Sequence, residues 1–227
     1  MQWTVLIPIK ALPAAKSRLM DATDGEQAHQ RLVQAIRQDT LAAAATALGV
    51  ARVVAVVDVA GMVDLQVDVA GTLDLLCFVQ SAPGLNVALG EADRWARERW
   101  QDDGVAALVG DLPALRPADL AGALAAAARY HRAFVPDASG TGTTLLAATG
   151  GIPLEPSFGL DSAARHAVTA ERLEAGAGLR GDVDTARDLA VALRLGVGAA
   201  TRALLGVDPG LRAYCDSRFP AAGTTVR

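Results

Sequence analysis

Hydrophobic residues follow one another along the chain in two alternating kinds of run. Short runs rich in β-branched residues, such as residues 3–9 and 52–57, are typical of buried strands. Longer Ala- and Leu-rich runs lie between them and repeat their apolar residues every three to four positions, as amphipathic helices do. The alternation predicts an α/β protein with βαβ units and a mostly parallel sheet that helices cover on both faces.

The predicted elements succeed each other without an evident linker. We expect strands at residues 3–9, 52–57, 74–79, 105–109, 133–135, 144–148 and 179–183, and helices at 26–48, 85–100, 117–130, 162–173 and from 185 onward. Neither a Pro/Gly/Ser-rich stretch nor a repeat divides residues 1–205, which we predict to form a single domain. Residues 206–227 are predicted to be a partly disordered C-terminal tail, and residues 58–74 support no interpretation.

The composition argues against nucleic acid as a partner. Hydrophobic residues make up 52% of the 227 residues and charged residues 20%, which is typical of a globular protein. The net charge is −4 and aromatic residues amount to 4%, so the chain lacks both a positive surface for phosphates and platforms for base stacking.

The uncharged stretches and the cysteines predict a cytoplasmic protein that does not bind a membrane. The longest uncharged stretches, residues 75–90 and 138–154, are interrupted by Pro, Gly, Ser and Thr, so neither is expected to span a bilayer. Cys77 and Cys215 are far apart and show neither CxxC nor zinc spacing.

The only two lysines of the chain follow its first predicted strand. Lys10 and Lys16 lie within seven positions of each other, Arg18 follows, and the other basic residues are all arginines. Open α/β sheets bind ligands at the carboxyl ends of their strands, and flexible ammonium groups suit phosphates. We therefore predict a phosphate-binding loop here, although it lacks the GxxxxGK[ST] and GxGxxG patterns. The alternative is a solvated basic loop.

Carboxylates follow two further predicted strands. Asp111 comes after the strand at 105–109, and Asp182 and Asp184 lie at the end of the strand at 179–183, on one side if that strand continues. Mg²⁺ prefers carboxylate oxygens together with water and phosphate oxygens. Alternatively, Asp111 caps a turn and Asp184 caps the next helix. Together with the lysines, these carboxylates predict a metal–triphosphate site.

Three other segments offer polar groups to an anion. The loop at 137–144 carries hydroxyls and backbone N–H groups, although such loops are most often plain hairpins. Ser162 begins a predicted helix, where it either caps the helix or helps to bind an anion. Asn86 either caps the helix at 85–100 or contacts a base or ribose. The histidines show no metal-binding spacing. His166 is expected at most to contact a residue that binds the ligand, and not the ligand itself.

In their order along the chain, these motifs resemble the guanylyltransferases that act on phosphoenolpyruvate or 2-phospho-L-lactate in the biosynthesis of the deazaflavin coenzyme F-420. The resemblance covers residues 5–198 and depends on AAKSRL at 14–19, GLN at 84–86, GDLPAL at 110–115, GTGT at 140–143, FGLDS at 158–162 and DVDT at 182–185. It implies a three-layer αβα sandwich with a mixed, mostly parallel sheet, like that of nucleotide-diphospho-sugar transferases.

The resemblance also implies roles for single residues. The phosphorylated acid would contact Thr143, Gly159 and Ser162. Mg²⁺ would be held by Asp111 with Asp182 or Asp184, and the nucleotide by Lys10, Lys16, Arg18 and Asn86. Lys16, Asp111 and Asp184 would take part most directly in catalysis.

The implied reaction transfers GMP from GTP to the phosphate of a three-carbon acid and releases pyrophosphate. The Arg- and Ala-rich composition is typical of a GC-rich genome. If the source resembles an actinobacterium, the family resemblance implies phosphoenolpyruvate as the acid, while 2-phospho-L-lactate and 3-phospho-D-glycerate carry the same groups. The resemblance also allows a homodimer.

Three other functions stay open at this point. They are a nucleotidyltransferase that loads guanylate onto the molybdenum cofactor, whose usual GGxSxRMG loop is absent here, a nucleotide-sugar glycosyltransferase, and a nucleotide-binding module without catalysis.

Overall fold

The computed structural model describes residues 1–9, 19, 23, 25–58, 75–207, 210 and 213. Its strands are β1 (Trp3–Ile9), β2 (Val50–Val57), β3 (Leu75–Val79), β4 (Gly104–Leu108), β5 (Arg132–Pro136), β6 (Thr143–Ala148) and β7 (Glu171–Arg172). Its helices are α1 (Glu26–Ala45), α3 (Leu85–Arg99), α4 (Pro117–Ala127), α5 (Ser162–His166), α6 (Ala177–Arg180), α7 (Ala186–Leu195) and α8 (Ala199–Val207).

In the described part of the chain the strands form one mixed sheet in the order β3-β2-β1-β4-β6-β5-β7. β6 runs antiparallel to β4 and to β5, and the other neighbouring strands pair in parallel. Leu108 at the end of β4 pairs with Leu145, and Pro136 at the end of β5 pairs with Thr143. One edge of the sheet, called the carboxyl edge below, is therefore made of the ends of β1, β4 and β5 and the start of β6.

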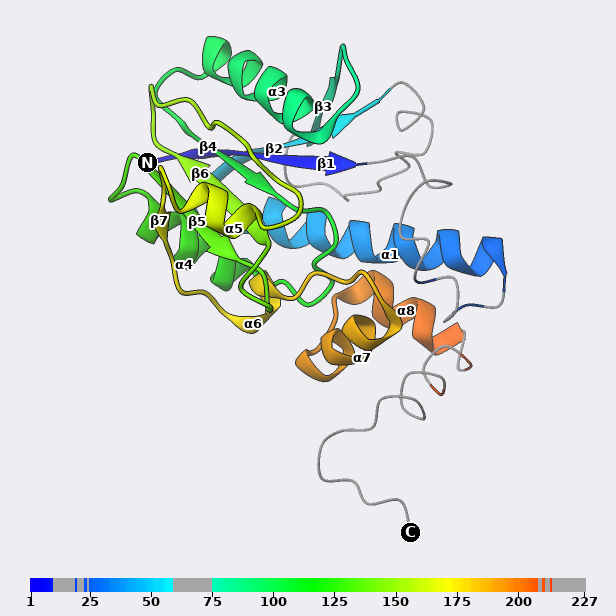
Figure 1. Cartoon of the computed structure of the whole chain (residues 1–227). Coiled ribbons are helices and arrows are strands. Elements are labelled where there is room, and N and C mark those ends of the chain that lie inside the picture. The colour runs from blue at the N-terminus through cyan, green and yellow to red at the C-terminus, as the bar shows by residue number, and fades with distance from the viewer. Residues whose placement is uncertain are drawn as a thin grey trace.

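Helices cover both faces of the sheet, as the sequence predicts for an αβα sandwich. α3 lies on one face, and α1 and α4 lie on the other (Figure 1). Along β1, Val5 and Ile7 pack toward α1 and α4, whereas Leu6 packs toward α3. A strand that is buried on both faces requires an uninterrupted apolar run, which explains the run of apolar residues along β1.

A close approach at the opposite edge of the sheet requires glycine. A Cβ on Gly104 would lie 2.4 Å from a ring atom of Trp3, which pairs with it across β1 and β4. Trp3 is 2% exposed, so its ring cannot move out into solvent without losing its packing. Gly104 thus leaves the space that the largest core side chain occupies.

Helices α7 and α8 pack beside α1 and form an apolar cluster with it, apart from the packing on the two faces of the sheet. Leu189 of α7 and Leu205 of α8 contact the cluster to which Leu32 of α1 belongs. The carboxylate of Asp39 in α1 accepts hydrogen bonds from the backbone N–H groups of Ala200 (2.8 Å) and of Thr201. These contacts fix the C-terminal helices to the sandwich.

In the described part of the chain, no single helix is both long and apolar enough to cross a membrane. Helices α7 and α8 would together be long and apolar enough, but they are bent by 111° relative to each other and pack in the cluster with α1.

Two predicted elements differ from the structure. The strand predicted at 179–183 is wrong: α6 ends at Arg180 and residues 181–184 form no regular strand. The helix predicted at 162–173 ends at His166, because the chain continues into β7, which pairs with β5. The domain limit predicted at residue 205 falls inside α8, and most of the predicted tail lies outside the described residues.

Candidate active site at the carboxyl edge of the sheet

The loop after β4 runs against the end of β1. A Cβ on Gly110 would lie 3.1 Å from the carbonyl oxygen of Pro8, so only glycine fits comfortably here. Asp111 therefore begins its turn beside the point where the predicted phosphate-binding loop leaves β1. Lys10, Lys16 and Arg18 lie outside the described residues, and their role stays a prediction.

The Asp111 loop is held from two sides. The hydroxyl of Thr40 in α1, fully buried, accepts a hydrogen bond from the backbone N–H of Leu112 at 2.9 Å. The backbone N–H of Val183 donates to the carbonyl oxygen of Asp111 at 3.0 Å. These bonds satisfy backbone groups of the loop and fix its path.

The same contact brings the second acidic segment to the loop. Asp182 and Asp184 flank Val183, which is fully buried; Asp182 is half-buried and Asp184 is exposed. A Cβ on Gly178 would lie 2.2 Å from the carbonyl oxygen of Ala114, so α6 packs directly on the backbone of the Asp111 loop. The structure therefore brings the three predicted carboxylates to neighbouring backbone positions, although the predicted strand is absent.

Asp184 does not cap the helix that follows it. The N-cap of α7 is Thr185, whose side chain accepts from the backbone N–H of Asp188 while Asp188 accepts from the N–H of Thr185 at 2.9 Å. This capping box fixes the direction in which the chain leaves the acidic segment. The alternative structural role considered for Asp184 is thereby excluded.

The carboxylates could hold a divalent metal only together with ligands that water and the substrate supply. Within the described residues, no three His, Cys, Asp or Glu side chains form a group that could hold a metal by themselves. Mg²⁺ commonly takes one or two protein carboxylates and completes its shell with water and substrate phosphates. Asp111 with one carboxylate of the Asp182/Asp184 pair suits that arrangement.

The hydroxyl-rich loop between β5 and β6 is closed on itself by Asp137. The carboxylate of Asp137 accepts from the backbone N–H of Thr141 at 3.0 Å and from the hydroxyl of Ser139 at 2.9 Å. Arg180 at the end of α6 donates to the carbonyl oxygen of Asp137 at 2.9 Å. The acidic segment that follows α6 is thus joined to the end of β5 as well as to the Asp111 loop.

Thr143 at the start of β6 is buried and paired with His166. Its Oγ1 lies 2.9 Å from Nδ1 of His166, and the Nε2 of His166 accepts a hydrogen bond from the backbone N–H of Ser157 at 2.9 Å. Thr143 is 6% and His166 3% exposed, and the imidazole packs between the rings of Phe134 and Phe158. Burial, and secondarily the nearby Arg165 guanidinium, lower the pKa of His166 from 6.5 to about 4.

Asn86 of α3 holds the FGLDS segment at 158–162 through two hydrogen bonds to its backbone. The side-chain oxygen of Asn86 accepts from the N–H of Phe158 at 2.7 Å, and its amide nitrogen donates to the carbonyl of Phe158 at 3.0 Å. Asn86 does not cap α3, whose N-cap is Gly84. Its contact with the nucleotide stays a prediction, and the structure gives it a clear role in fixing the loop.

Gly159 and Ser162 lie in a tight turn of this segment. Gly159 has φ +121°, which non-glycine residues rarely adopt, and Asp161 precedes α5 in the left-handed region with φ 52°. Asp161, and not Ser162, is therefore the N-cap of α5, and Ser162 is 2% exposed. The backbone N–H of Ala163 donates to the carbonyl of Thr141 at 3.0 Å, which joins this turn to the hydroxyl-rich loop.

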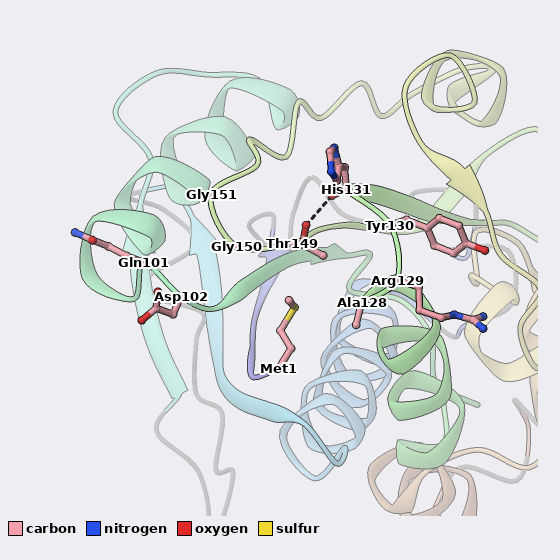
Figure 2. A pocket seen from close by; sticks show the side chains of 10 residues that line it. All are labelled: Met1, Gln101, Asp102, Ala128, Arg129, Tyr130, His131, Thr149, Gly150 and Gly151. Atoms are coloured by element: carbon pink, nitrogen blue, oxygen red, sulfur yellow. Dashed lines mark hydrogen bonds between the residues drawn. The ribbon is translucent and has the colours of Figure 1, made fainter.

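A cavity of about 720 Å³ lies at the other edge of the sheet. Figure 2 shows its lining side chains, among them Asp102 before β4 and Thr149 after β6. None of the predicted site residues lines it. The predicted site and this cavity therefore lie at opposite ends of the strands.

Three residues that shape the carboxyl edge were not singled out from the sequence. Thr40 accepts a hydrogen bond from the backbone of Leu112, and Gly178 packs on the backbone of Ala114. Arg180 donates to a carbonyl group 43 residues away. The local sequence carries no signal for such contacts. The glycines that flank the short α6 are the one feature that could have drawn attention to this region.

Comparison with protein families gives a match over nearly the whole core. Residues 3–205 match the family described as "Guanylyl transferase CofC like". The chain is 49% identical over 210 residues to a phosphoenolpyruvate guanylyltransferase of Streptomyces avermitilis, covering 89% of this chain and 94% of that protein. It is 46% identical to the protein of that name from Streptomyces coelicolor, with 90% and 96% coverage.

Solved structures show the same fold at low identity. A protein classed as a nucleotide-diphospho-sugar transferase, from Desulfovibrio desulfuricans, matches with a TM-score of 0.68 and 18% identity over 94% of this chain and 99% of that one. Rv0371C from Mycobacterium tuberculosis, solved in complex with manganese, matches with a TM-score of 0.50 and 17% identity, covering 86% and 99%. These likenesses confirm the nucleotide-diphospho-sugar transferase-like fold.

Proposed function

The chain belongs to the CofC-like guanylyl transferase family, and we propose that it transfers GMP from GTP to the phosphate of phosphoenolpyruvate. The observation that carries this substrate assignment is the identity of 46–49% to relatives named phosphoenolpyruvate guanylyltransferase, over about nine tenths of the chain. The products are enolpyruvyl-diphospho-guanosine and pyrophosphate. By the same resemblance, the product serves the synthesis of coenzyme F-420.

The reaction makes one phosphorus–oxygen bond and breaks another. A phosphate oxygen of the acid attacks the α-phosphorus of GTP, and the bond from that phosphorus to the bridging oxygen of the β-phosphate breaks, so that pyrophosphate leaves with the bonding electrons. Because a phosphate monoester has a second pKa of about 6, the nucleophile is already largely dianionic at neutral pH. No protein base is needed, which agrees with a site whose buried histidine has both ring nitrogens engaged.

The main obstacle is electrostatic repulsion between two anions in a protein of net charge −4. Local positive charge must therefore be placed where the phosphates meet. We assign Lys10, Lys16 and Arg18 to the triphosphate, where they would stabilise the departing pyrophosphate. In-line positioning and charge neutralisation supply most of the catalysis in reactions of this kind.

Asp111 and one of Asp182 and Asp184 would hold a divalent metal, Mg²⁺ in our proposal. The backbone bond between Val183 and Asp111 supports this assignment, because it places both carboxylate-bearing segments at one edge. The fold neighbour in complex with manganese is in keeping with a divalent metal in this fold. When bound, such an ion neutralises charge on phosphate oxygens.

Thr143, Gly159 and Ser162 would bind the phosphorylated acid. The bond between Ala163 and Thr141 supports a shared site, since it joins the segment of Gly159 and Ser162 to the loop that leads into Thr143. Asn86 would act mainly by fixing the Phe158 backbone next to Gly159.

Pyrophosphate release from GTP tests the proposal. The protein is incubated with GTP, Mg²⁺ and either phosphoenolpyruvate, 2-phospho-L-lactate or 3-phospho-D-glycerate, and the highest kcat/KM is expected for phosphoenolpyruvate. Faster release with another acid would change the substrate while keeping the reaction. Transfer from a nucleotide sugar, or GTP binding without pyrophosphate release, would overturn the proposal.

A further inference from the structure

The hydrogen bonds of His166 determine which of its ring nitrogens carries the proton. A backbone N–H can only donate, so the bond from the N–H of Ser157 at 2.9 Å requires an unprotonated Nε2. A neutral imidazole then carries its hydrogen on Nδ1. The ring is therefore the Nδ1–H tautomer, held between two partners.

This tautomer determines how the hydroxyl of Thr143 is used. Nδ1–H of His166 is a donor, so Oγ1 of Thr143 at 2.9 Å is its acceptor. A hydroxyl has one hydrogen to donate and two lone pairs that accept. Because His166 occupies a lone pair, the hydrogen of Thr143 is directed to another group. Among the described residues, the Thr143 hydroxyl is hydrogen-bonded to His166 alone.

The surroundings prevent the ring from reversing its roles. His166 is 3% exposed and packs against Phe158 with ring centroids 5.1 Å apart and against Phe134 at 6.1 Å. Arg165 is the charged neighbour on the same short helix, and its guanidinium donates to the carbonyl and hydroxyl of Ser157. A protonated ring would put a donor on Nε2 against the N–H of Ser157, in an apolar and positively charged setting.

We infer that His166 is a positioning residue that makes the Thr143 hydroxyl an obligatory hydrogen-bond donor toward an anionic oxygen of the phosphorylated acid. The inference deepens the proposed function and depends on the placement of Thr143 in that site. It gives the site a chemical preference. A carboxylate or phosphate oxygen of the ligand can bind beside Thr143, because it accepts the hydrogen bond, whereas a donor group of the ligand cannot. A site built this way rejects analogues that cannot accept the hydrogen bond.

Two substitutions separate the two bonds of His166. His166→Gln places a side-chain oxygen near the position of Nε2, so it keeps an acceptor for Ser157 and loses the donor to Thr143. His166→Asn places an amide N–H near the position of Nδ1, so it keeps the donor to Thr143 and loses the acceptor for Ser157. Thermal unfolding of both variants shows whether each is folded before kinetics are compared.

Steady-state kinetics then distinguish positioning from simple structural support. His166→Gln is expected to raise KM for the acid on the order of tenfold, the effect of one hydrogen bond to a charged group, with KM for GTP unchanged. His166→Asn keeps the donor to Thr143 and is expected to raise KM for the acid less than His166→Gln does. In a Thr143→Val background, His166→Gln should add no further loss. A larger loss in the Asn variant, or equal losses with and without the Thr143 hydroxyl, would overturn the inference.

A measurement on the wild-type chain needs no variant to fold. Nitrogen-15 chemical shifts of the imidazole rings at neutral pH are expected to show a protonated Nδ1 and an unprotonated Nε2 for His166. The chain has three histidines, so variants at the other two, His29 and His131, assign the signals. The opposite tautomer would overturn the inference even if guanylyl transfer is confirmed, and absence of transfer in the wild type would count against the proposed function instead.

Discussion

The backbone N–H of Val183 donates a hydrogen bond to the carbonyl oxygen of Asp111 at 3.0 Å, across 72 residues of sequence. This one contact brings the turn after β4 together with the acidic segment before α7. It explains how a proposed metal site forms although the second segment is not a strand of the sheet. A substitution that displaces either backbone segment is expected to move Asp111 away from Asp182 and Asp184.

The Asp111 carboxylate is predicted to be required for transfer but not for folding. Asp111→Asn keeps the shape of the side chain and removes its charge, so pyrophosphate release with GTP, acid and Mg²⁺ should become undetectable while the melting temperature changes little. Asp102→Asn makes the same change in the exposed residue two positions before β4 and should leave turnover unaltered. Wild-type turnover in Asp111→Asn would remove this residue from the site.

Gly178→Ala is predicted to lower activity by displacing the acidic segment. Its Cβ would lie 2.2 Å from the Ala114 carbonyl oxygen, and backbone atoms cannot give way cheaply. We expect kcat to fall at least tenfold, together with a loss of stability of about 1–3 kcal/mol. Urea unfolding and pyrophosphate release measure both effects.

Gly122→Ala is the matched control for that substitution. Gly122 lies in the middle of α4, and a Cβ there would meet no atom within 4 Å. Alanine favours the helix over glycine by about 0.5–1 kcal/mol, so this variant should be slightly more stable and fully active. If both alanine variants lose activity equally, close packing at Gly178 is not what positions the site.

The predicted elements agree with the structure wherever burial determines the pattern. β1 and α3 are found where their apolar runs predict them, because a doubly covered sheet requires such runs. The strand predicted at 179–183 failed because its two apolar ends, Leu179 and Val183, are equally compatible with a turn that buries both residues. Both Leu179 and Val183 are indeed fully buried.

The candidate site was predictable only in part. Asp111, Thr143 and Ser162 follow from motifs at strand and loop ends, and the structure places them in segments that are bonded to one another through Val183, Arg180 and Ala163. The role of His166 depends on a backbone donor at Ser157, which no spacing in the sequence reveals. Contacts of this kind exist only once the chain has folded.

Gly104→Ala is predicted to destabilise the sheet without touching the site. The new Cβ would lie 2.4 Å from the ring of buried Trp3, and overpacking of this kind costs about 1–3 kcal/mol. Trp3→Phe removes the ring atoms in question, so the double variant should be more stable than the sum of the single losses predicts. Additive losses in urea unfolding would contradict this account of Gly104.

The stability of the protein is predicted to fall with pH in a window set by His166. Burial lowers the pKa of this residue to about 4 in the folded chain, while the unfolded chain binds the proton near pH 6.5. Between these values the unfolded state binds more protons, so the free energy of unfolding decreases as the pH falls from 6.5 toward 4. A pKa difference of this size corresponds to at most about 3 kcal/mol of stability, at about 1.4 kcal/mol for each pKa unit.

Urea unfolding at several pH values checks this window by comparison with His166→Gln. Other groups titrate in the same range, so the informative quantity is the difference between wild type and variant. That difference should narrow as the pH falls below 6.5. A difference that stays constant from pH 7.5 to pH 4.5 would show that His166 is not held neutral by the fold.

The central claim is that a phosphate oxygen of the acid attacks the α-phosphorus of GTP. Phosphoenolpyruvate labelled with ¹⁸O in its phosphate group, incubated with GTP, Mg²⁺ and the protein, tests it by phosphorus-31 NMR of the products. The account predicts ¹⁸O in the oxygen that bridges the two phosphorus atoms of the new diphosphate and unlabelled pyrophosphate. Unlabelled bridging oxygen, or GMP that carries oxygen from water in place of a diphosphate product, would contradict it.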